Sequence, residues 1–389
     1  MRILMVSDDP ADGMAGAVKV PHKLAQALRA AGHQCDVLFS EELGTWPAGG
    51  RLRDSVGPWL AWRAVARQWS EHGPYDVIDA ASAEGWMIAW ARRWGRFPGA
   101  AVVARSHGLE HIQYDELLND HAAGHLRKRW WRRWWYPLVR LSQVTLNIRL
   151  ADRAILLNCR SRDIVVKRGW QPPQSIDLIP HGVDATRWTS APVSGAARGA
   201  GALFAGAWYS TKGAPYLAQA HRRLIGQGIH LPLTVMGGSP GDPDAINERY
   251  VRASFASESQ PWLTVLPWET DEDAVFAQYR RHDFLVCPST AEGFGMVVLE
   301  ALSQRLPVVC TTAVGASERL RAGAEALIVP PRDSKALADA MARLWHDAAL
   351  RRLLGDAGHE RVREWSWRHA AEATLGTYAA ARAAVAGAK

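Results

Sequence analysis

Short apolar runs alternate with helical segments along the whole chain, and this alternation restricts the fold more than any other feature of the sequence. Residues 2–6 form the first apolar run, and apolar residues then recur at helical spacing over residues 24–31. A second apolar run follows at residues 35–39. Strand, helix and strand in this order predict one βαβ unit of a parallel sheet.

The unit repeats in two series, which predict two domains. The first series of strands is predicted at residues 2–6, 35–39, 76–78, 101–104, 154–157 and 175–179, and the second at residues 202–205, 233–236, 264–266, 284–287, 308–310 and 326–329. Residues 189–202 between them are rich in Gly, Ala and Ser, which is typical of a linker. We therefore predict an α/β protein of two doubly wound parallel-sheet domains, with ligands in the cleft between them.

The composition excludes several other classes of protein. The 389 residues suit two domains of about 150 residues or more, and 48% hydrophobic with 22% charged residues is typical of globular proteins. No run of about 18 apolar residues predicts a membrane-spanning helix, and the first residues lack the apolar region of a signal peptide. The cysteines are far apart, so we expect free thiols in the cytoplasm and no zinc site.

Residues 287–302 carry the strongest chemical signal. A predicted strand ends at Cys287, a loop with two glycines follows, and a helical pattern begins near Met296. The unpaired N–H groups at the start of a helix attract anions, so a diphosphate fits there. Glu292 and Glu300 flank this position, and each carboxylate can accept hydrogen bonds from a vicinal diol of a sugar or a ribose.

The segment from Glu292 to Glu300 resembles the Glu-x7-Glu motif of the retaining glycosyltransferases of family 4, which have the GT-B fold. The resemblance covers nearly the full chain. It implies an N-terminal Rossmann-like acceptor-side domain at residues 1–190 and a C-terminal domain for the nucleotide-sugar donor at residues 191–370. A last helix, residues 371–389, is expected to pack back on the first domain.

The resemblance also implies roles for single residues of this segment. Glu292 would contact the donor sugar and Glu300 the ribose of the nucleotide. The backbone around four residues between them would hold the sugar and the distal phosphate: Gly293, Phe294, Gly295 and Met296. In a front-face displacement that retains the anomeric configuration, the start of the helix would stabilise the leaving diphosphate.

Lys212 lies in a loop that resembles the phosphate-binding loop of the family. Ala207 stands where the family often has Arg, so Lys212 is expected to be the single positive charge there. Trp208 is expected to stack or pack in the gap, and Trp268 is a candidate wall for the nucleobase.

Two motifs in the first half also resemble the family. Gly16 ends a loop that resembles the first glycine loop, and it would approach the donor phosphate or the acceptor. His107 would lie beside the reacting sugar, although a single His after a strand is more often structural. His181 stands where the family has Asn, in a turn between the domains, and we expect a structural role for it.

We expect no metal ion and no other cofactor, because the nucleotide sugar is itself the substrate. Residues 242–244 and 271–273 each spell Asp-x-Asp. Such three-letter patterns arise often by chance, and a hard cation needs several converging oxygen atoms.

Residues 126–140, with the sequence LRKRWWRRWWYPLVR, form a basic aromatic segment in the half of the chain that carries most of the net charge of +7. As a helix kinked at Pro137, the segment would place its Trp residues on one arc and its Arg residues, Arg140 among them, on the other. Two interpretations stay open: an interfacial helix on an anionic membrane surface, or a helix whose Trp face packs on the first domain. No nucleic-acid-binding motif accompanies the segment, so we expect no nucleic acid as a partner.

We therefore predict a metal-independent, retaining hexosyltransferase. It would move a sugar from a UDP- or GDP-sugar to a hydroxyl of a glycan or lipid-linked glycan in envelope or exopolysaccharide biosynthesis. We expect it in the cytoplasm, with peripheral association at the inner face of the membrane through residues 126–140. Two alternatives stay open: a nucleotide-sugar epimerase of GT-B fold, and a non-catalytic protein that binds membranes or polyanions.

Overall fold

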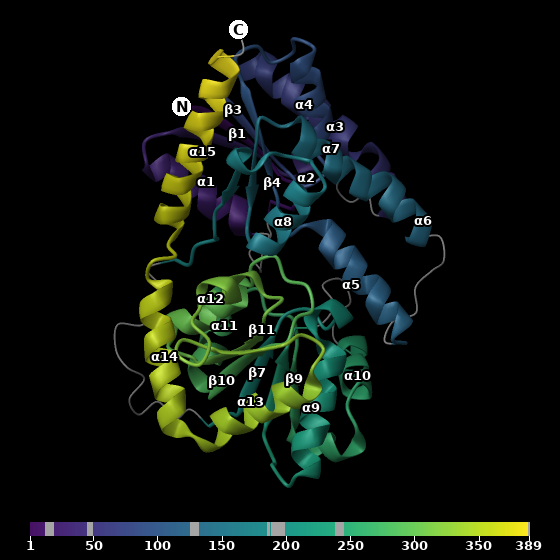
Figure 1. The fold of residues 1–389 in the computed structure, drawn as a ribbon, viewed down its shortest axis with the longest axis vertical. Helices are drawn as coiled ribbons and strands as arrows, with labels where there is room; N and C mark the ends of the chain where they lie inside the picture. Colours follow the sequence, from purple (N-terminus) through teal and green to yellow (C-terminus); the bar gives the residue numbers. More distant parts are fainter. Residues whose placement is uncertain are drawn as a thin grey trace.

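The computed structural model of the chain describes residues 1–11, 19–44, 50–124, 132–184, 187, 199–237 and 245–387. Within these residues the chain forms two lobes, each built on a six-stranded parallel sheet (Figure 1). This confirms the predicted fold class of two doubly wound domains. The strands are β1 (Arg2–Val6), β2 (Gln34–Leu38), β3 (Val77–Ala81), β4 (Ala101–Arg105), β5 (Arg153–Leu156) and β6 (Ile176–Leu178), then β7 (Ala202–Ala205), β8 (Leu233–Met236), β9 (Leu263–Leu266), β10 (Phe284–Cys287), β11 (Val308–Thr311) and β12 (Leu327–Val329).

The strand order indicates where each lobe can bind a ligand. The first sheet has the order β2-β1-β3-β4-β5-β6, and the second has the order β12-β11-β10-β7-β8-β9. In each sheet, successive strands are added first on one side of the starting strand and then on the other side. The direction reverses between β1 and β3 in the first sheet and between β7 and β10 in the second. At such a reversal the connections leave in opposite directions and open a crevice at the carboxyl ends of the strands. The loops after these strands are therefore the first place to look for a site.

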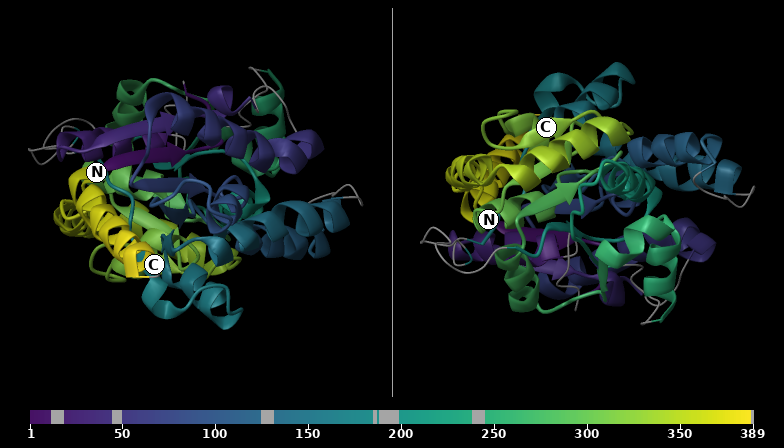
Figure 2. Two further views of the ribbon diagram at one scale, coloured as in Figure 1. Left: turned by 90° about the horizontal axis from the view of Figure 1, so that it is seen from above. Right: turned by 90° about the horizontal axis from the view of Figure 1, so that it is seen from below.

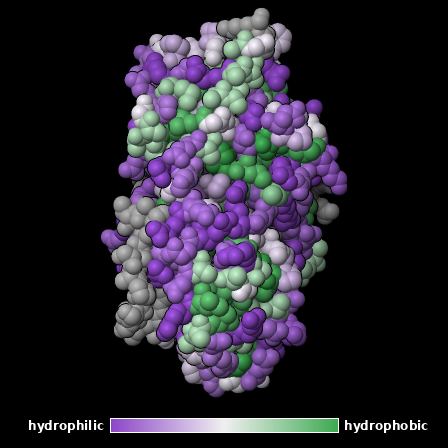
Figure 3. Space-filling view, turned by 60° about the vertical axis from the view of Figure 1, so that its left-hand side comes forward, coloured by the Kyte–Doolittle hydropathy of each residue, from purple (hydrophilic) through white to green (hydrophobic). Residues whose placement is uncertain are grey.

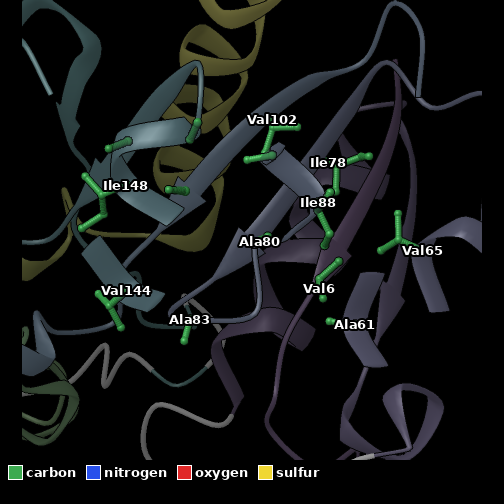
Figure 4. Close-up of a cluster of buried hydrophobic side chains, with 14 of the residues drawn as sticks. Val6, Ala61, Val65, Ile78, Ala80, Ala83, Ile88, Val102, Val144 and Ile148 are labelled. Atoms are coloured by element: carbon green, nitrogen blue, oxygen red, sulfur yellow. The ribbon is translucent and has the colours of Figure 1, made fainter. Parts of the chain in front are cut away.

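Helices cover the first sheet. They are α1 (Val20–Ala30), α2 (Ser40–Leu43), α3 (Gly50–His72), α4 (Trp86–Arg93), α5 (Glu110–Ala122), α6 (Arg132–Tyr136), the π-helical turn η2 (Pro137–Leu141), α7 (Ser142–Leu150), α8 (Cys159–Lys167) and the 3-10 turn η3 (Pro173–Ser175). All residues of β3 and β4 are buried, as in a parallel sheet covered on both faces. On one face, Ile78 and Val102 of the sheet pack near Ile88 of α4 and Val144 and Ile148 of α7 (Figure 4).

The second sheet is covered in the same way. Its helices are η5 (Ser210–Lys212), α9 (Ala214–Gly226), α10 (Ala245–Ala253), η6 (Ser257–Trp262), α11 (Glu272–Arg281), α12 (Met296–Ser303), η7 (Gly315–Arg319), α13 (Ser334–His346) and α14 (Ala348–Val362). One apolar cluster joins the sheet to α9 and α13, and another joins it to α11 and α12. On the face of the molecule in Figure 3, hydrophobic atoms form separate patches among hydrophilic ones.

The last helix, α15 (Trp367–Gly387), leaves the second lobe and packs on the first, beside α1 and β4 (Figures 1 and 2). The hydroxyl of its buried Tyr378 donates a hydrogen bond to Oδ2 of Asp79 at 2.6 Å. The same oxygen accepts a hydrogen bond from Arg105 at 2.6 Å. Each buried charge thus has a partner, which makes its burial tolerable and fixes α15 on the first lobe. Residues 188–198, which contain most of the predicted linker, lie outside the described residues.

The basic aromatic segment is described from residue 132 onward. α6, η2 and α7 follow one another without a break, so Pro137 changes the type of helix and does not end it. Trp134 and Leu138 are 67% and 72% exposed. These two apolar side chains therefore do not pack on the first lobe.

Arg140 was expected on the solvated arc of this segment, and the structure shows that this prediction is wrong. Its guanidinium is buried, where it pairs with Glu84 at 2.7 Å, Glu110 at 3.1 Å and Asp8 at 3.4 Å. The π-helical turn directs this residue toward the carboxyl ends of β1, β3 and β4, after which the three carboxylates lie. The helical wheel missed this because a π-helical turn departs from the spacing of 3.6 residues per turn.

Candidate active site

The loop after β10 meets the first lobe at the reversal point of the second sheet. Helix α12 begins directly after Gly295, whose φ of +95° is a conformation that glycine adopts without strain. A Cβ atom on Gly293 would lie 2.2 Å from the carbonyl oxygen of His107. One glycine therefore turns the chain into the helix, and the other permits close contact between the lobes.

Lys212 and Glu292 form an ion pair beside the start of α12. Nζ of Lys212 is 2.5 Å from Oε2 of Glu292, and the Ser289 hydroxyl donates to the same oxygen at 3.4 Å. Burial opposes the charge of Lys212, but Glu292 outweighs this and raises the pKa of Lys212 above its ordinary value. A hydrogen bond from the Thr290 amide to the Thr211 carbonyl, at 2.8 Å, holds the two loops together.

Glu300 lies in the second turn of α12 and is buried. Its Oε1 accepts a hydrogen bond from Nζ of Lys19 at 2.5 Å, and its Oε2 accepts one from the Tyr279 hydroxyl at 2.8 Å. Lys19 belongs to the first lobe and also lies 3.2 Å from Oε1 of Glu272. A cavity of about 100 Å³ opens beside these groups, with Trp268 in its wall. The cavity is therefore lined both by the charged side chains of Lys19, Glu272 and Glu300 and by the aromatic ring of Trp268.

His107 faces the site from the first lobe, after β4. Its ring centroid lies 5.6 Å from that of His181, which also packs on Phe294 and Trp367. Burial lowers the pKa of His107 to about 4, with a further contribution from Arg105, and it lowers the pKa of His181 well below its ordinary value. Both rings are therefore neutral at pH 7. Nδ1 of His107 is buried and has no hydrogen-bond partner in the described part of the chain.

Some residues of the site escaped the sequence prediction. Asn158, directly before α8, caps this helix through Oδ1 and donates a hydrogen bond from Nδ2 to the carbonyl oxygen of Gly293 at 2.6 Å. A polar residue between a predicted strand and a predicted helix was a usable signal for this position. Lys19 and Tyr279 reach Glu300 from distant parts of the sequence and belong to no recognisable motif.

The other predicted residues differ in what their side chains do. Phe294 and Met296 are buried in apolar clusters, so their backbone groups are what they can offer a ligand. Trp208 is 2% exposed and stacks on Phe255 within the second lobe, so it packs there and does not stack at the phosphate loop. Gly16 lies outside the described residues.

The second Asp-x-Asp sequence has structural contacts. Asp271 caps α11 by accepting a hydrogen bond from the amide of Asp273, and Asp273 pairs with Arg187. Residues 242–244, which hold the first Asp-x-Asp sequence, lie outside the described residues.

Two Rossmann-like lobes, a returning C-terminal helix and a polar site at the reversal point of the second sheet together define the GT-B class of proteins. Residues 14–187 match the family described as Glycosyltransferase Family 4, and residues 200–347 match Glycosyl transferases group 1. The protein belongs to the family-4 glycosyltransferases, which confirms what its Glu-x7-Glu motif predicted.

Several curated relatives are D-inositol 3-phosphate glycosyltransferases. The one from Pseudarthrobacter chlorophenolicus is 34% identical over 53% of this chain and 50% of its own length. The one from Nocardia farcinica is 28% identical over 59% of this chain and 53% of its own length, so the chain spans about half the length of these two relatives. The one from Streptomyces bingchenggensis is 25% identical over 96% of this chain and 86% of its own length.

Solved structures share the fold over nearly the full chain. Sucrose-phosphate synthase from Thermosynechococcus elongatus has a TM-score of 0.77 and 20% identity, over 98% of this chain and 99% of that chain. HepE from Anabaena in complex with UDP-glucose has a TM-score of 0.70 and 16% identity, over 98% of this chain and 100% of that chain. At these identities the likeness shows the fold alone.

Proposed function

We propose that the protein transfers a hexosyl group, with retention of configuration, from a UDP- or GDP-sugar to a hydroxyl of a glycan or lipid-linked glycan in envelope or exopolysaccharide biosynthesis. The observation that carries the proposal is the Lys212–Glu292 pair beside the start of α12. Glu292 is followed by Gly293, which contacts the His107 backbone, and the buried Glu300 lies eight residues further on. Membership of the family supports glycosyl transfer. The complexes of HepE with UDP and UDP-glucose support a nucleotide-sugar donor.

In this proposal the protein binds, orients and stabilises charge. The start of α12 and Lys212 attract the leaving diphosphate. Glu292 orients the sugar by accepting hydrogen bonds from the sugar hydroxyls. Neutral His107 offers Nδ1 to the sugar from the opposite lobe. The acceptor oxygen bonds to the anomeric carbon on the face from which the phosphate oxygen departs, and that phosphate oxygen takes the acceptor proton. This route requires neither a protein nucleophile nor a metal ion.

A screen of UDP- and GDP-sugars by thermal shift and by hydrolysis tests the proposal. We expect one donor to stabilise the protein, and Glu292→Gln to lower kcat/KM about 100-fold or more with little change in melting temperature. Glu248→Gln is the matched control, because Glu248 is an exposed carboxylate that pairs with Arg252 on α10. Wild-type turnover by Glu292→Gln would contradict the assignment of this site.

The acceptor side of the first lobe favours an uncharged acceptor. Asp8 and Asp9 follow β1, and Glu84 and Glu110 follow β3 and β4, at the reversal point of the first sheet. Burial and the neighbouring Asp8 raise the pKa of Asp9 to about 6, which reflects the crowding of acidic groups. Arg140 and Arg53 offset two of these four negative charges, and the remaining negative charge would repel a phosphomonoester. Because relatives are named for D-inositol 3-phosphate, the acceptor screen includes it beside neutral glycans, and we expect higher kcat/KM with the latter.

Peripheral membrane association is part of the proposal. Four exposed tryptophans lie on the helices α3, α4 and α6 or, for Trp94, directly after α4: Trp59, Trp90, Trp94 and Trp134. The segments α4, α6, η2 and α7 contain Arg residues and no Asp or Glu. Aromatic and basic side chains on one surface suit an anionic bilayer. In the part of the chain that the structure describes, no helix is long and apolar enough to span a membrane.

Co-sedimentation with phosphatidylglycerol vesicles tests this association. We expect the protein to bind at low salt, and the double variant Trp94→Ser, Trp134→Ser to bind several-fold less. The control is Tyr250→Ser, which replaces another exposed aromatic side chain, on α10 of the second lobe, and it is expected to bind like the wild type. Equal binding by all three proteins, or no binding by the wild type, would refute the assignment of this surface.

A further inference from the structure

Lys19 reaches from one lobe into the other. It directly precedes α1 of the first lobe, yet its ammonium group lies between Glu300 of α12 and Glu272 of α11. The distances from Nζ to the two Oε1 atoms are 2.5 and 3.2 Å, and the Lys19 side chain is 8% exposed. All three residues line the cavity of about 100 Å³. A cation of the first lobe thus forms part of the wall of a cavity that Trp268, the candidate wall for the nucleobase, also lines.

Both oxygens of Glu300 already have partners in this arrangement. Tyr279 binds Oε2 from within the same lobe and is buried, so this hydrogen bond is compatible with any movement of the lobes. Lys19 binds Oε1 from the opposite lobe. Lys19 takes one lone pair of Oε1 and Tyr279 takes one of Oε2, so a ribose diol that binds both oxygens must share each of them with a protein donor. The diol and the ammonium group therefore compete for the same oxygen.

We propose that Lys19 is a built-in competitor of the nucleotide, whose ion pair with Glu300 fills the ribose subsite in the free enzyme and shifts to Glu272 when the nucleotide binds. This inference rests on the proposed function, in which Glu300 binds the ribose. The shift is short because the two carboxylates already flank one ammonium group, and it leaves the buried cation paired. Burial opposes the charge on Lys19, but Glu300 and Glu272 outweigh it and raise its pKa.

The competition connects donor binding with the contact between the lobes. In Figure 1, α1 lies on the left of the molecule, and α5 lies on the right. On the α5 side, Arg332 of the second lobe pairs with Glu116 and Asp120, away from the cavity. Because Glu272 also belongs to the second lobe, the shift exchanges one ion pair between the lobes for another, and both sides stay paired.

Calorimetric titration of UDP and GDP into the purified full chain and its variants tests the inference. Lys19→Met removes the competing ammonium group, and we expect it to bind nucleotide about 3- to 10-fold more tightly than the wild type. Lys23→Met is the matched control on the next turn of α1. It removes an ion pair with Asp184, 3.4 Å long, that does not line the cavity, and we expect unchanged affinity.

A double-mutant cycle tests the shift to Glu272. Glu272→Gln removes the second partner of Lys19, so we expect it to weaken nucleotide binding about 3- to 10-fold in the wild-type background. In the Lys19→Met background the same substitution is expected to have no effect on nucleotide affinity, because no ammonium group remains for Glu272 to pair with. Equal weakening in both backgrounds would show that Glu272 contacts the nucleotide itself, and would overturn the shift.

Weaker or unchanged binding by a folded Lys19→Met protein would overturn the competition. Lys19→Gln is a second variant in case Met disturbs the fold, and we expect it to bind more tightly than the wild type as well. Failure of the proposed function gives a different result, because the wild type would then bind neither UDP nor GDP. Tight binding by the wild type with no gain in either Lys19 variant refutes this inference and leaves the proposed function intact.

Discussion

The two lobes place charge differently at the carboxyl ends of their sheets. In the second lobe, Lys212 is 35% exposed and pairs with Glu292 beside the start of a helix. In the first lobe, Arg140 is 9% exposed and pairs with Glu84, which is 1% exposed. A partly exposed pair, or a buried pair with a second partner within reach, can exchange its partners for those of a ligand, whereas a buried pair that is broken without a replacement leaves an uncompensated charge. From this comparison we expect the Lys212–Glu292 pair to serve ligand binding in the second lobe and the Arg140 pairs to serve folding in the first.

Arg140→Met should give the largest effect if the charges of the first lobe maintain its fold. The substitution leaves Glu84 and Glu110 buried beside each other without their cation, and breaking a buried pair in this way costs about 3–5 kcal/mol. We expect a fall in melting temperature of roughly 10 °C, measured by calorimetry. Arg149→Met, at an exposed position of α7, is the control. A variant as stable as the control would mean that the network is not structural.

Lys212→Met should give the reverse pattern, with a small change in stability and a large change in rate. The ammonium group is expected to stabilise the leaving diphosphate, and losing such a group costs about 100- to 1000-fold in kcat/KM. Steady-state kinetics with the donor from the screen, together with a melting curve, measure both quantities. Lys335→Met removes an exposed pair with Asp339 and should change neither. If Lys212→Met lowers stability as much as Arg140→Met does, the contrast between the lobes is wrong.

The pH dependence of stability tests the buried histidine of the first lobe. The pKa of His107 is about 4 in the folded state against 6.5 ordinarily, so between these values the unfolded state binds a proton that the folded state does not. The free energy of unfolding should therefore fall as the pH is lowered through this window, by about 1–2 kcal/mol at pH 5 from His107 alone.

Other groups of the first lobe titrate with the opposite sign, so the test needs a difference measurement. The pKa of Asp9 is raised to about 6, and stability from such a group is lost as the pH rises from about 4 to 6. Urea unfolding of the wild type and of His107→Gln at pH 7 and pH 5 cancels this contribution. We expect the wild type to lose about 1–2 kcal/mol more than the variant between the two pH values. Equal losses would show that His107 is accessible to protons in the folded protein.

The contrast between the lobes also explains which parts of the site the sequence could predict. Glu292 and Glu300 lie in one loop-helix segment, so their spacing alone predicts that they flank the start of a helix. Lys19 and Glu300 are separated by 281 positions in the sequence and meet only when the lobes pack. The strands were predictable because each is marked by a short apolar run in the sequence itself. The burial of Arg140 depends on a π-helical turn, which the spacing of apolar residues in the sequence does not predict.

Asn158→Ser should give the smallest effect, because it removes a single hydrogen bond between the β5 end and the Gly293 carbonyl. Ser can still accept from the amide of Ser161 and cap α8, so the stability of the first lobe should change little. A single hydrogen bond contributes about 0.5–1.5 kcal/mol, which predicts a fall in kcat/KM of about 2- to 10-fold. Asn158→Ala, which loses the cap as well, should lower the melting temperature in addition. A fall in stability without a change in kcat/KM for Asn158→Ser would mean that this contact supports the fold of the first lobe and does not position the donor loop.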